Sequence, residues 1–257
     1  MKITVCETPN EETEFEKEWG RLARHVAREK SDLVLLPEMP FFHWFAENRK
    51  FDRKVWRRAV LEHRLWMARL PELGAPVVLG TRPVDSRGKK LNEGFVWSGK
   101  SGSRGVHSKR YLPDEPGFYE ASWYDRGDGR FDPFSVAGWK GGFMICSDLW
   151  SMASARAYGK NGVDLIAVPR CTGAGSVEKW VAGGRVAAIL SGAYCASSNR
   201  AGKGSKVAFG GHGWIIDPNG EILGLTSKER PFLTAGIDRS KAEKAKSTYP
   251  RDALRPD

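Results

Sequence analysis

The run Gly-Gly-Phe-Met-Ile-Cys-Ser-Asp-Leu-Trp, from Gly141 to Trp150, is the most informative stretch of this chain. Its apolar residues predict a buried strand, and the small polar residues after Cys146 predict that the strand ends there in a turn. A thiol at such a strand end is held rigidly and is left accessible to a substrate. Cys146 is therefore a candidate nucleophile, although a lone Cys after an apolar strand is more often a small core residue.

Two other segments supply groups that complete a reaction centre. Glu38 follows the apolar run Leu33–Leu36 and Pro37, and Lys109 lies in His-Ser-Lys-Arg-Tyr-Leu-Pro, just before a loop rich in Pro and Gly. Taken alone, Glu38 can cap a helix and Lys109 can be a surface charge. Together with Cys146 they form a base, a cation and a nucleophile, in that chain order.

The composition is that of a folded chain. A length of 257 residues is enough for a full core, and no linker or internal repeat is visible, so residues 1–257 are predicted to form a single domain. The formal net charge of +10 can indicate nucleic acid, an anionic surface or an acidic substrate. Because the basic residues are spread over the whole sequence, we expect a solvated surface and no nucleic-acid partner.

Several classes of protein are not indicated. The four cysteines have no Cys-x-x-Cys spacing, and the N-terminal segment lacks the apolar core of a signal peptide, so we expect a cytoplasmic protein with no membrane partner. The five histidines have no metal-ligand spacing. The sequence also lacks a Gly-x-Ser-x-Gly elbow, a Gly-x-Gly-x-x-Gly turn and a P-loop. We therefore expect an enzyme without a metal or another cofactor.

Strand and helix signals alternate along the chain. Apolar residues that repeat at three and four residues predict a helix at Glu12–Glu29, and an amphipathic pattern predicts another at Phe51–Leu70. Further helices are predicted at Ser151–Lys160 and Val177–Ser191. Apolar runs bounded by turn signals predict strands at Ile3–Cys6, Asp32–Leu36, Pro76–Thr81, Glu93–Ser98, Gly105–Lys109, Phe134–Ala137, Gly142–Cys146, Val163–Val168, Ala193–Ser197, Val207–Ile216, Glu221–Leu225 and Phe232–Ile237. This series predicts an α/β fold in which helices cover a mixed sheet system.

The three candidate residues stand in motifs that resemble those of the nitrilase superfamily of carbon-nitrogen hydrolases. The motifs are Leu-Pro-Glu at Glu38, His-Ser-Lys-Arg-Tyr-Leu-Pro at Lys109 and Ile-Cys-Ser-Asp-Leu-Trp at Cys146. The resemblance extends through Asn92 and the late Gly213–Pro218 run, and so covers essentially the entire chain. It implies a four-layer αββα sandwich. It also implies a homodimer or higher homo-oligomer, because members of the family commonly pair.

The resemblance implies a role in amide hydrolysis for each of these groups. An ordinary Cys is mostly protonated at neutral pH and needs a base, for which Glu38 is the candidate. Lys109, with a backbone N–H beside the nucleophile such as that of Ser147, is expected to stabilise the negatively charged tetrahedral oxygen. Glu120 matches the second glutamate of the amidase and carbamoylase branches, which orients the lysine or the substrate.

Four more residues are candidates for the substrate pocket. Phe42 and Trp44 follow the Glu38 segment, and they either wall the pocket or pack in the core or in a dimer interface. Arg170 either binds a substrate carboxylate or lies on a solvated face. Thr172 belongs to the same loop, which can border the pocket.

The sequence thus predicts a cysteine-dependent amidase. Its substrate is expected to be a small carboxamide or an N-carbamoyl compound, cleaved to an acid and ammonia through a thioester at Cys146. Ser147 and Asp148 stand where true nitrilases usually have Trp and Glu, which favours an amide over a nitrile. A nitrilase acting on a small nitrile is one alternative. A catalytically silent scaffold or binding module is another, and the intact set of Glu, Lys and Cys argues against it.

Overall fold

The structure is a computed structural model that describes residues 1–253. Its helices are α1 (Glu12–Glu29), α2 (Arg53–Ala68), α3 (Met152–Lys160), α4 (Val177–Ser191) and α5 (Arg239–Ala245). The strands of the first sheet are β1 (Lys2–Pro9), β2 (Leu33–Leu35), β3 (Val77–Ser86), β4 (Lys89–Ser98), β5 (Gly102–Ser108) and β13 (Phe232–Gly236). Those of the second sheet are β6 (Phe134–Val136), β7 (Trp139–Phe143), β8 (Leu165–Arg170), β9 (Tyr194–Lys203), β10 (Ala208–Gly210), β11 (Trp214–Ile216) and β12 (Ile222–Leu225).

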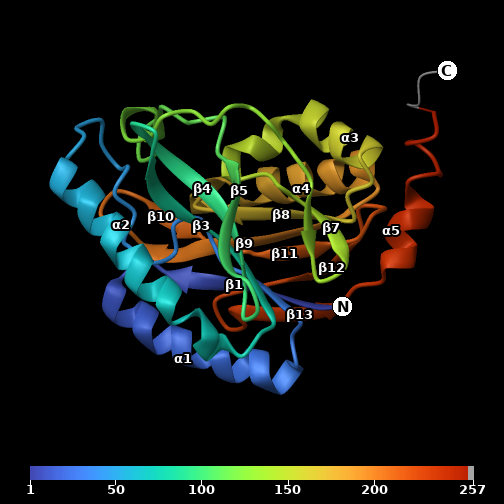
Figure 1. The fold of residues 1–257 in the computed structure, drawn as a ribbon, viewed down its shortest axis with the longest axis horizontal. Helices are drawn as coiled ribbons and strands as arrows, with labels where there is room; N and C mark the ends of the chain where they lie inside the picture. Colours follow the sequence, from blue (N-terminus) through green and yellow to red (C-terminus); the bar gives the residue numbers. More distant parts are fainter. Residues whose placement is uncertain (254–257) are drawn as a thin grey trace.

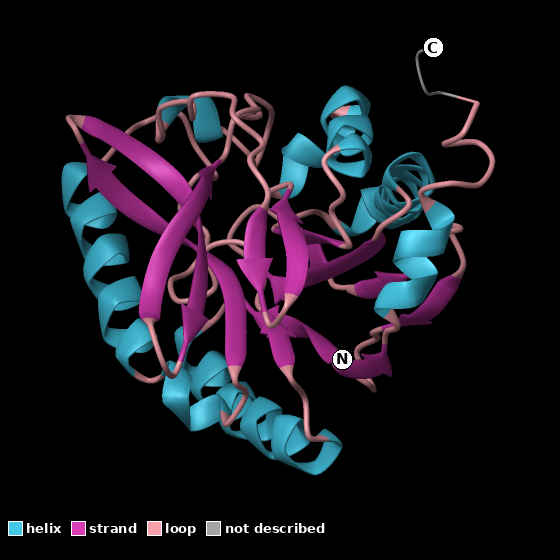
Figure 2. Cartoon of the chain, turned by 45° about the vertical axis from the view of Figure 1, so that its right-hand side comes forward, coloured by secondary structure: helices cyan, strands magenta, loops and turns pink. Residues whose placement is uncertain are grey.

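The two sheets pack face to face and are nearly closed into a barrel, with helices on both outer faces (Figure 1, Figure 2). The main path of paired strands is β5-β4-β3-β2-β1-β9-β8-β7-β6, and β1 joins the sheets because its last residues pair with β9. Helices α1 and α2 contact the first sheet, and α4 contacts the second and carries α3 beside it. The predicted four-layer αββα sandwich is therefore confirmed.

Strand direction sets where the loops converge. Strands β1, β2 and β3 are mutually parallel, and β7, β8 and β9 run parallel to one another and to β1. Strand β5 is antiparallel to β4, which is antiparallel to β3, so β5 also points the same way. The carboxyl ends of all these strands consequently lie at one end of the sandwich, which is where ligands bind in many α/β proteins.

Successive side chains along β2 and the residue after it pack into two different layers. Leu33 and Leu35 point into the core between the sheets, whereas Val34 and Leu36 belong to the layer beneath α1. This is why the strand reads as a continuous apolar run, as expected when both faces are buried. The predicted apolar face of α1 fills the outer layer with Phe15, Trp19, Leu22 and Val26.

Two predicted strands differ from the structure. The strand predicted at Val207–Ile216 is two strands, β10 and β11, because Gly211 and His212 adopt left-handed backbone with φ of 57° and 53° and break the extended run. The strand predicted at Gly142–Cys146 ends at Phe143, and Cys146 instead starts a short 3-10 turn that continues to Trp150. The apolar residues that follow Phe143 are buried in the core without being part of the ladder.

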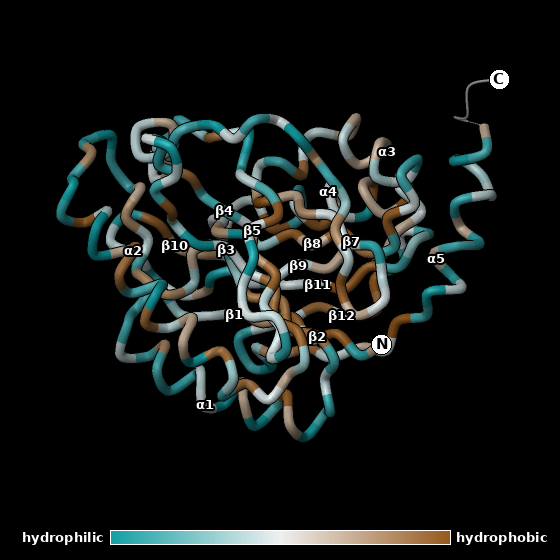
Figure 3. Tube along the Cα trace, in the orientation of Figure 1, coloured by the Kyte–Doolittle hydropathy of each residue, from teal (hydrophilic) through white to brown (hydrophobic). Residues whose placement is uncertain are grey.

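Hydropathy follows the layers. Brown, apolar residues run along the central strands, and the outer helices alternate between apolar and polar along their length (Figure 3). In residues 1–253, no helix combines the length and the apolar character that crossing a bilayer requires.

The contact between α4 and the second sheet depends on a small residue. Gly184 faces Trp214 of β11, which is fully buried, and a Cβ atom on Gly184 would lie 2.8 Å from the indole ring. We expect Gly184→Ala to lower the free energy of unfolding by about 1–3 kcal/mol through overpacking.

The matched control is Gly20→Ala in α1. Its Cβ atom would meet nothing closer than the flexible end of Arg24 at 3.6 Å, so helix propensity alone predicts a gain of up to about 1 kcal/mol. Urea unfolding followed by circular dichroism measures both variants. A Gly184→Ala protein as stable as the wild type would contradict the packing described here.

Candidate active site

Glu38, Lys109, Glu120 and Cys146 meet at the end of the sandwich where the parallel strands finish. Glu38 lies in the loop after β2, Lys109 directly follows β5, and Cys146 lies in the turn after β7. All four side chains are buried, and the charges of the other three act on the thiol of Cys146. Within residues 1–253, no group of three or more His, Cys, Asp or Glu side chains is placed to hold a metal ion.

The ammonium group of Lys109 is held between two carboxylates. Its Nζ donates to Oε1 of Glu38 at 2.7 Å and to Oε1 and Oε2 of Glu120 at 2.8 and 2.6 Å. A lysine ammonium has three N–H donors, so these three hydrogen bonds use all of them. These hydrogen bonds therefore fix the direction of the Lys109 side chain, and the two carboxyl groups stabilise its positive charge.

The two carboxylate oxygens of Glu38 differ. Oε1 accepts from Lys109 and also from Nδ2 of Asn92 in β4, at 2.7 Å. Oε2 is buried and has no hydrogen-bond partner in the described part of the chain. A buried acceptor left unpaired is costly, and an unpaired carboxylate oxygen is also what a general base uses to take a proton. Asn92 is a site residue that the sequence indicated only through the family resemblance.

Burial and neighbouring charges shift the pKa values in this site. Burial alone would lower the pKa of Lys109, but the negative charges of Glu120 and Glu38 outweigh it and raise that pKa well above its usual value. Burial raises the pKa of Glu120 to about 8, against the pull of Lys109. Burial and then the charge of Glu38 raise the pKa of Cys146 well above that of a free thiol. At neutral pH, Cys146 is therefore a thiol that needs a base.

The backbone at Cys146 is strained. Its φ of 48° lies in the left-handed region, which residues other than glycine seldom adopt. Such strain persists only where the surroundings hold it, and it is concentrated at functional sites. The sharp turn places Sγ 3.9 Å from the carbonyl oxygen of Cys171, in the loop after β8. Three loops from three strands thus surround the sulfur and its neighbours.

Ser147 lies at the surface side of the same turn. Its hydroxyl donates to the carbonyl oxygen of Tyr111, two residues after Lys109. Both residues border a cavity of about 470 Å³, which is lined by Tyr111, Leu112, Pro113, Arg126, Ser147, Trp150 and Ser151. This cavity is the nearest described hollow to the nucleophile along the chain. The role of the Ser147 N–H as an oxyanion donor stays a prediction.

Arg170 is hydrogen-bonded inside the protein and is not exposed to solvent. It is fully buried, and its guanidinium donates to Ser197 Oγ at 2.7 Å, to Thr172 Oγ1 at 3.0 Å and to the carbonyl oxygen of His212 at 2.7 Å. It also stacks on the ring of Trp214 at 4.0 Å. The alternative of a solvated face for Arg170 is therefore wrong. Contact of Arg170 or Thr172 with a substrate stays a prediction.

Phe42 and Trp44 are buried in an aromatic cluster beside the Glu38 loop. The indole N–H of Trp44 donates to the carbonyl oxygen of Gly117 at 2.9 Å, which ties this loop to the segment that carries Glu120. Trp44 also forms part of the floor of a cavity of about 740 Å³, together with Phe45. Of the two alternatives for Phe42 and Trp44, core packing is what the structure describes, and a contact with substrate stays a prediction.

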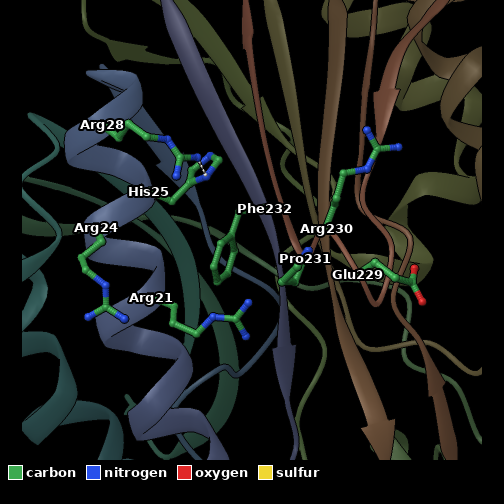
Figure 4. A pocket seen from close by; sticks show the side chains of 8 residues that line it. All are labelled: Arg21, Arg24, His25, Arg28, Glu229, Arg230, Pro231 and Phe232. Atoms are coloured by element: carbon green, nitrogen blue, oxygen red, sulfur yellow. Dashed lines mark hydrogen bonds between the residues drawn. The ribbon is translucent and has the colours of Figure 1, made fainter.

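A third hollow, of about 430 Å³, lies between α1 and the turn that leads into β13 (Figure 4). It is lined by Arg21, Arg24, His25, Arg28, Glu229, Arg230, Pro231 and Phe232. A guanidinium N–H of Arg28 donates to Nδ1 of His25 at 3.0 Å, and burial followed by the charge of Arg28 lowers the pKa of His25. The fold therefore brings the basic side chains of one face of α1 close to Arg230, at a place separate from the cluster of Glu38, Lys109, Glu120 and Cys146.

Comparison with known families agrees with this geometry. The family model described as Carbon-nitrogen hydrolase matches residues 2–247. The chain belongs to the carbon-nitrogen hydrolase family. This carbon-nitrogen hydrolase is 31% identical to Omega-amidase NIT2 of Mus musculus over 248 residues, which covers 89% of this chain and 84% of the relative.

Two further comparisons extend the same finding. The carbon-nitrogen hydrolase is 30% identical over 250 residues to N-carbamoylputrescine amidase of Oryza sativa subsp. japonica, covering 85% of this chain and 78% of the relative. In fold it is similar to the crystal structure of a carbon-nitrogen hydrolase from Helicobacter pylori G27, with a TM-score of 0.87 and 22% identity over 99% of this chain and 95% of that one.

The raised pKa of Glu120 predicts a pH-dependent stability difference for Glu120→Gln. The pKa of Glu120 is about 8 in the fold and about 4.5 ordinarily, so between these values the folded state binds more protons than the unfolded state. The contribution of Glu120 to stability is therefore present at low pH and falls as the pH rises through this window. Gln does not ionise, so the Glu120→Gln variant does not lose stability in this way as the pH rises. Relative to the wild type, the variant should gain stability between about pH 4.5 and pH 8 in urea unfolding, whereas a constant difference would contradict the shift.

Proposed function

We propose that this protein hydrolyses a small carboxamide or N-carbamoyl compound, with Cys146 as the nucleophile and a thioester as the intermediate. The observation that carries the proposal is the Lys109 ammonium, bonded to Glu38 and Glu120 beside the Cys146 thiol. This cluster supplies a nucleophile, a base and a fixed positive charge from the chain itself. Family membership and relatives named as amidases support a reaction at a carbon-nitrogen bond of an amide.

The first half of the proposed reaction makes the thioester. Oε2 of Glu38 takes the proton of the Cys146 thiol as the sulfur attacks the carbonyl carbon of the substrate. Lys109 stabilises the negative charge that develops on the carbonyl oxygen. The carbon-nitrogen bond then breaks, Glu38 returns the proton to the nitrogen, and ammonia leaves. The acyl group remains on Cys146.

The second half restores the enzyme. Glu38 takes a proton from a water molecule, and the resulting hydroxide attacks the thioester carbon. The carbon-sulfur bond breaks, the proton returns to the sulfur, and the acid is released. With an N-carbamoyl substrate the acid is a carbamic acid, and the same residues serve both halves.

The raised pKa of Cys146 supports the assignment of Glu38 as the base. Burial and the charge of Glu38 oppose the formation of a free thiolate, so the sulfur has to lose its proton in the same step in which it attacks. That requires an acceptor with an available lone pair. Oε2 of Glu38 has one, because no described residue donates to it.

Two observations bear on the nature of the substrate. The residues after the nucleophile, Ser147 and Asp148, favour an amide over a nitrile, and N-carbamoylputrescine amidase and Omega-amidase NIT2 are both named for cleaving amide-type bonds. We therefore propose an amide or carbamoyl substrate, in a protein that acts in the cytoplasm. Hydrolysis of a nitrile and a purely structural role are the outcomes that a substrate test separates from it.

Intact-mass spectrometry tests the reaction directly. The protein is mixed with a panel of small carboxamides, N-carbamoyl amines and matching nitriles, and ammonia release is followed in parallel. We expect an adduct with the mass of the substrate minus ammonia on Cys146 for at least one amide or carbamoyl compound. Ammonia release from nitriles alone would overturn the amidase assignment, and no turnover with any compound would favour a scaffold.

Variants assign the roles. Cys146→Ala should abolish both the adduct and ammonia release, and Lys109→Met should lower kcat by about 100- to 1000-fold, because the fixed positive charge that stabilises the oxyanion is lost. The matched control is Cys195→Ala, which removes a buried thiol from β9 and should leave kcat close to that of the wild type. Equal losses for Cys146→Ala and Cys195→Ala would indicate that folding, and not chemistry, is affected.

The quaternary state that the family resemblance implies is a separate proposal. We propose that the protein forms a homodimer or higher homo-oligomer and that its basic surface binds no nucleic acid. Sedimentation velocity at micromolar concentration should give at least twice the mass of 28.6 kDa calculated for one chain. Added duplex DNA at low ionic strength should not shift the boundary, and a shift that disappears with salt would contradict the second expectation.

A further inference from the structure

Asp148 lies at the centre of a hydrogen-bond network between two catalytic segments. Its Oδ1 accepts from the backbone N–H groups of Arg110 and Tyr111 at 3.1 and 3.0 Å. Its Oδ2 accepts from the backbone N–H of Ile145 at 3.2 Å and from Nε2 of His107 at 2.9 Å. The carboxylate is fully buried. The backbone donors belong to the two residues that directly follow Lys109 and to the residue that directly precedes Cys146.

His107 faces two acceptors. Besides Nε2 at Asp148, its Nδ1 lies 3.1 Å from the carbonyl oxygen of Arg130. A neutral imidazole has a single N–H and can satisfy only one of these acceptors, whereas the imidazolium has two. A protonated Asp148 would instead donate from Oδ2 to Nε2, but three backbone N–H groups point at this side chain, the arrangement in which an ionised carboxylate is bound. With Asp148 ionised, the doubly protonated ring is the form that satisfies every partner.

We propose that His107 and Asp148 are positioning residues that act as a buried imidazolium–carboxylate pair. The pair fastens the turn carrying Cys146 to the segment that follows Lys109, and so fixes the sulfur relative to the ammonium. Neither residue takes part in bond breaking. The inference rests on the proposed roles of Cys146 and Lys109, and it adds the element that sets their separation.

The strained backbone of Cys146 explains why such a link is needed. A residue with φ of 48° relaxes unless its neighbours are held, and Asp148 holds the preceding residue, Ile145, at its N–H through the carboxylate and at its carbonyl oxygen through the Asp148 backbone N–H. On the C-terminal side, the hydroxyl of Ser147 bonds to the carbonyl oxygen of Tyr111. Both sides of the nucleophile are therefore tied to Tyr111, and Asp148 also ties them to Arg110. A displacement of about 1 Å at a reacting group can lower the rate by about 100-fold.

The surroundings of His107 contain no competing carboxylate bonded to the ring among residues 1–253. Its flank is the ring of Phe131, with centroids 4.8 Å apart. The carboxylate of Asp132 is engaged by Arg130 at 3.0 Å. Tyr158 lies behind Phe131, and burial, followed by the negative charge of Asp148, raises its pKa, so it stays neutral. Asp148 is thus the partner that balances an imidazolium here.

Nuclear magnetic resonance of the wild-type protein with ¹⁵N-labelled histidine tests the charge state without any mutation of the site. At pH 7 we expect both ring nitrogens of His107 to carry protons, and the signals to be assigned by their absence in His107→Gln. A single protonated ring nitrogen on His107 would overturn the proposal. This outcome does not depend on whether a substrate is known.

The positioning role is tested by the rate at which iodoacetamide alkylates Cys146, measured by mass spectrometry. Asp148→Asn and His107→Phe should slow it by about 10- to 100-fold, because the thiol is displaced from its base. His107→Gln keeps an N–H directed at Asp148 and should be intermediate. An alkylation rate equal to or above that of the wild type, in variants that still unfold cooperatively, would contradict the role.

The matched control is Asp164→Asn. Asp164 is also a buried carboxylate, and it accepts from the backbone N–H of Lys140 at 3.1 Å and from Nζ of Lys246 at 2.9 Å, away from the catalytic cluster. Its variant should lose stability but alkylate at the wild-type rate. If both Asp variants alkylate equally slowly, the effect is structural. Because alkylation needs no substrate, this inference can fail while the proposed hydrolysis stands, and the reverse also holds.

Discussion

One buried ammonium, that of Lys109, serves two buried carboxylates, and the electrostatics of the site depend on this imbalance. Removing an ionised carboxylate from water costs several kcal/mol unless a partner compensates it, and here a single cation faces two carboxyl groups. Burial raises the pKa of Glu120 to about 8 despite this cation, and burial followed by the charge of Glu38 raises the pKa of Cys146. A free thiolate would add a further buried negative charge. The proton of the thiol must therefore move to a neighbouring group within the cluster, not to bulk water.

The fold delivers this cluster through strand direction. The carboxyl ends of β2, β5 and β7 lie at the same end of the sandwich, so Glu38, Lys109 and Cys146 need only short loops to meet, although more than a hundred residues separate the first from the last. Strand β4 contributes as well, because it presents Asn92 to Glu38, and β5 then returns the chain to the same end. The strand topology therefore determines which chemical groups meet at the site.

Local signals predicted most of the elements, and the motifs indicated the residues that the fold gathers around Cys146, but the long-range polar contacts were not predicted. Helices α1 and α4 have the predicted bounds, and each is followed by a residue in left-handed conformation, Lys30 and Gly192. The break between β10 and β11 was missed because it depends on the backbone of Gly211 and His212 and not on composition. The bond between His107 and Asp148 joins residues far apart in sequence, and no spacing rule reveals it.

In the proposed mechanism, the position of Cys146, more than its acidity, sets its reactivity. In a site where burial raises the pKa of the thiol, lowering that pKa is not the route to a nucleophile, and the attack has to be coupled to proton transfer. Coupled transfer is sensitive to geometry, since donor, acceptor and carbonyl carbon must align together. This explains why residues with no part in bond breaking, Asp148 among them, are fully buried and fully bonded around the nucleophile. The hydrogen bonds that fix the position of the Cys146 sulfur also offset the cost of burying these polar residues.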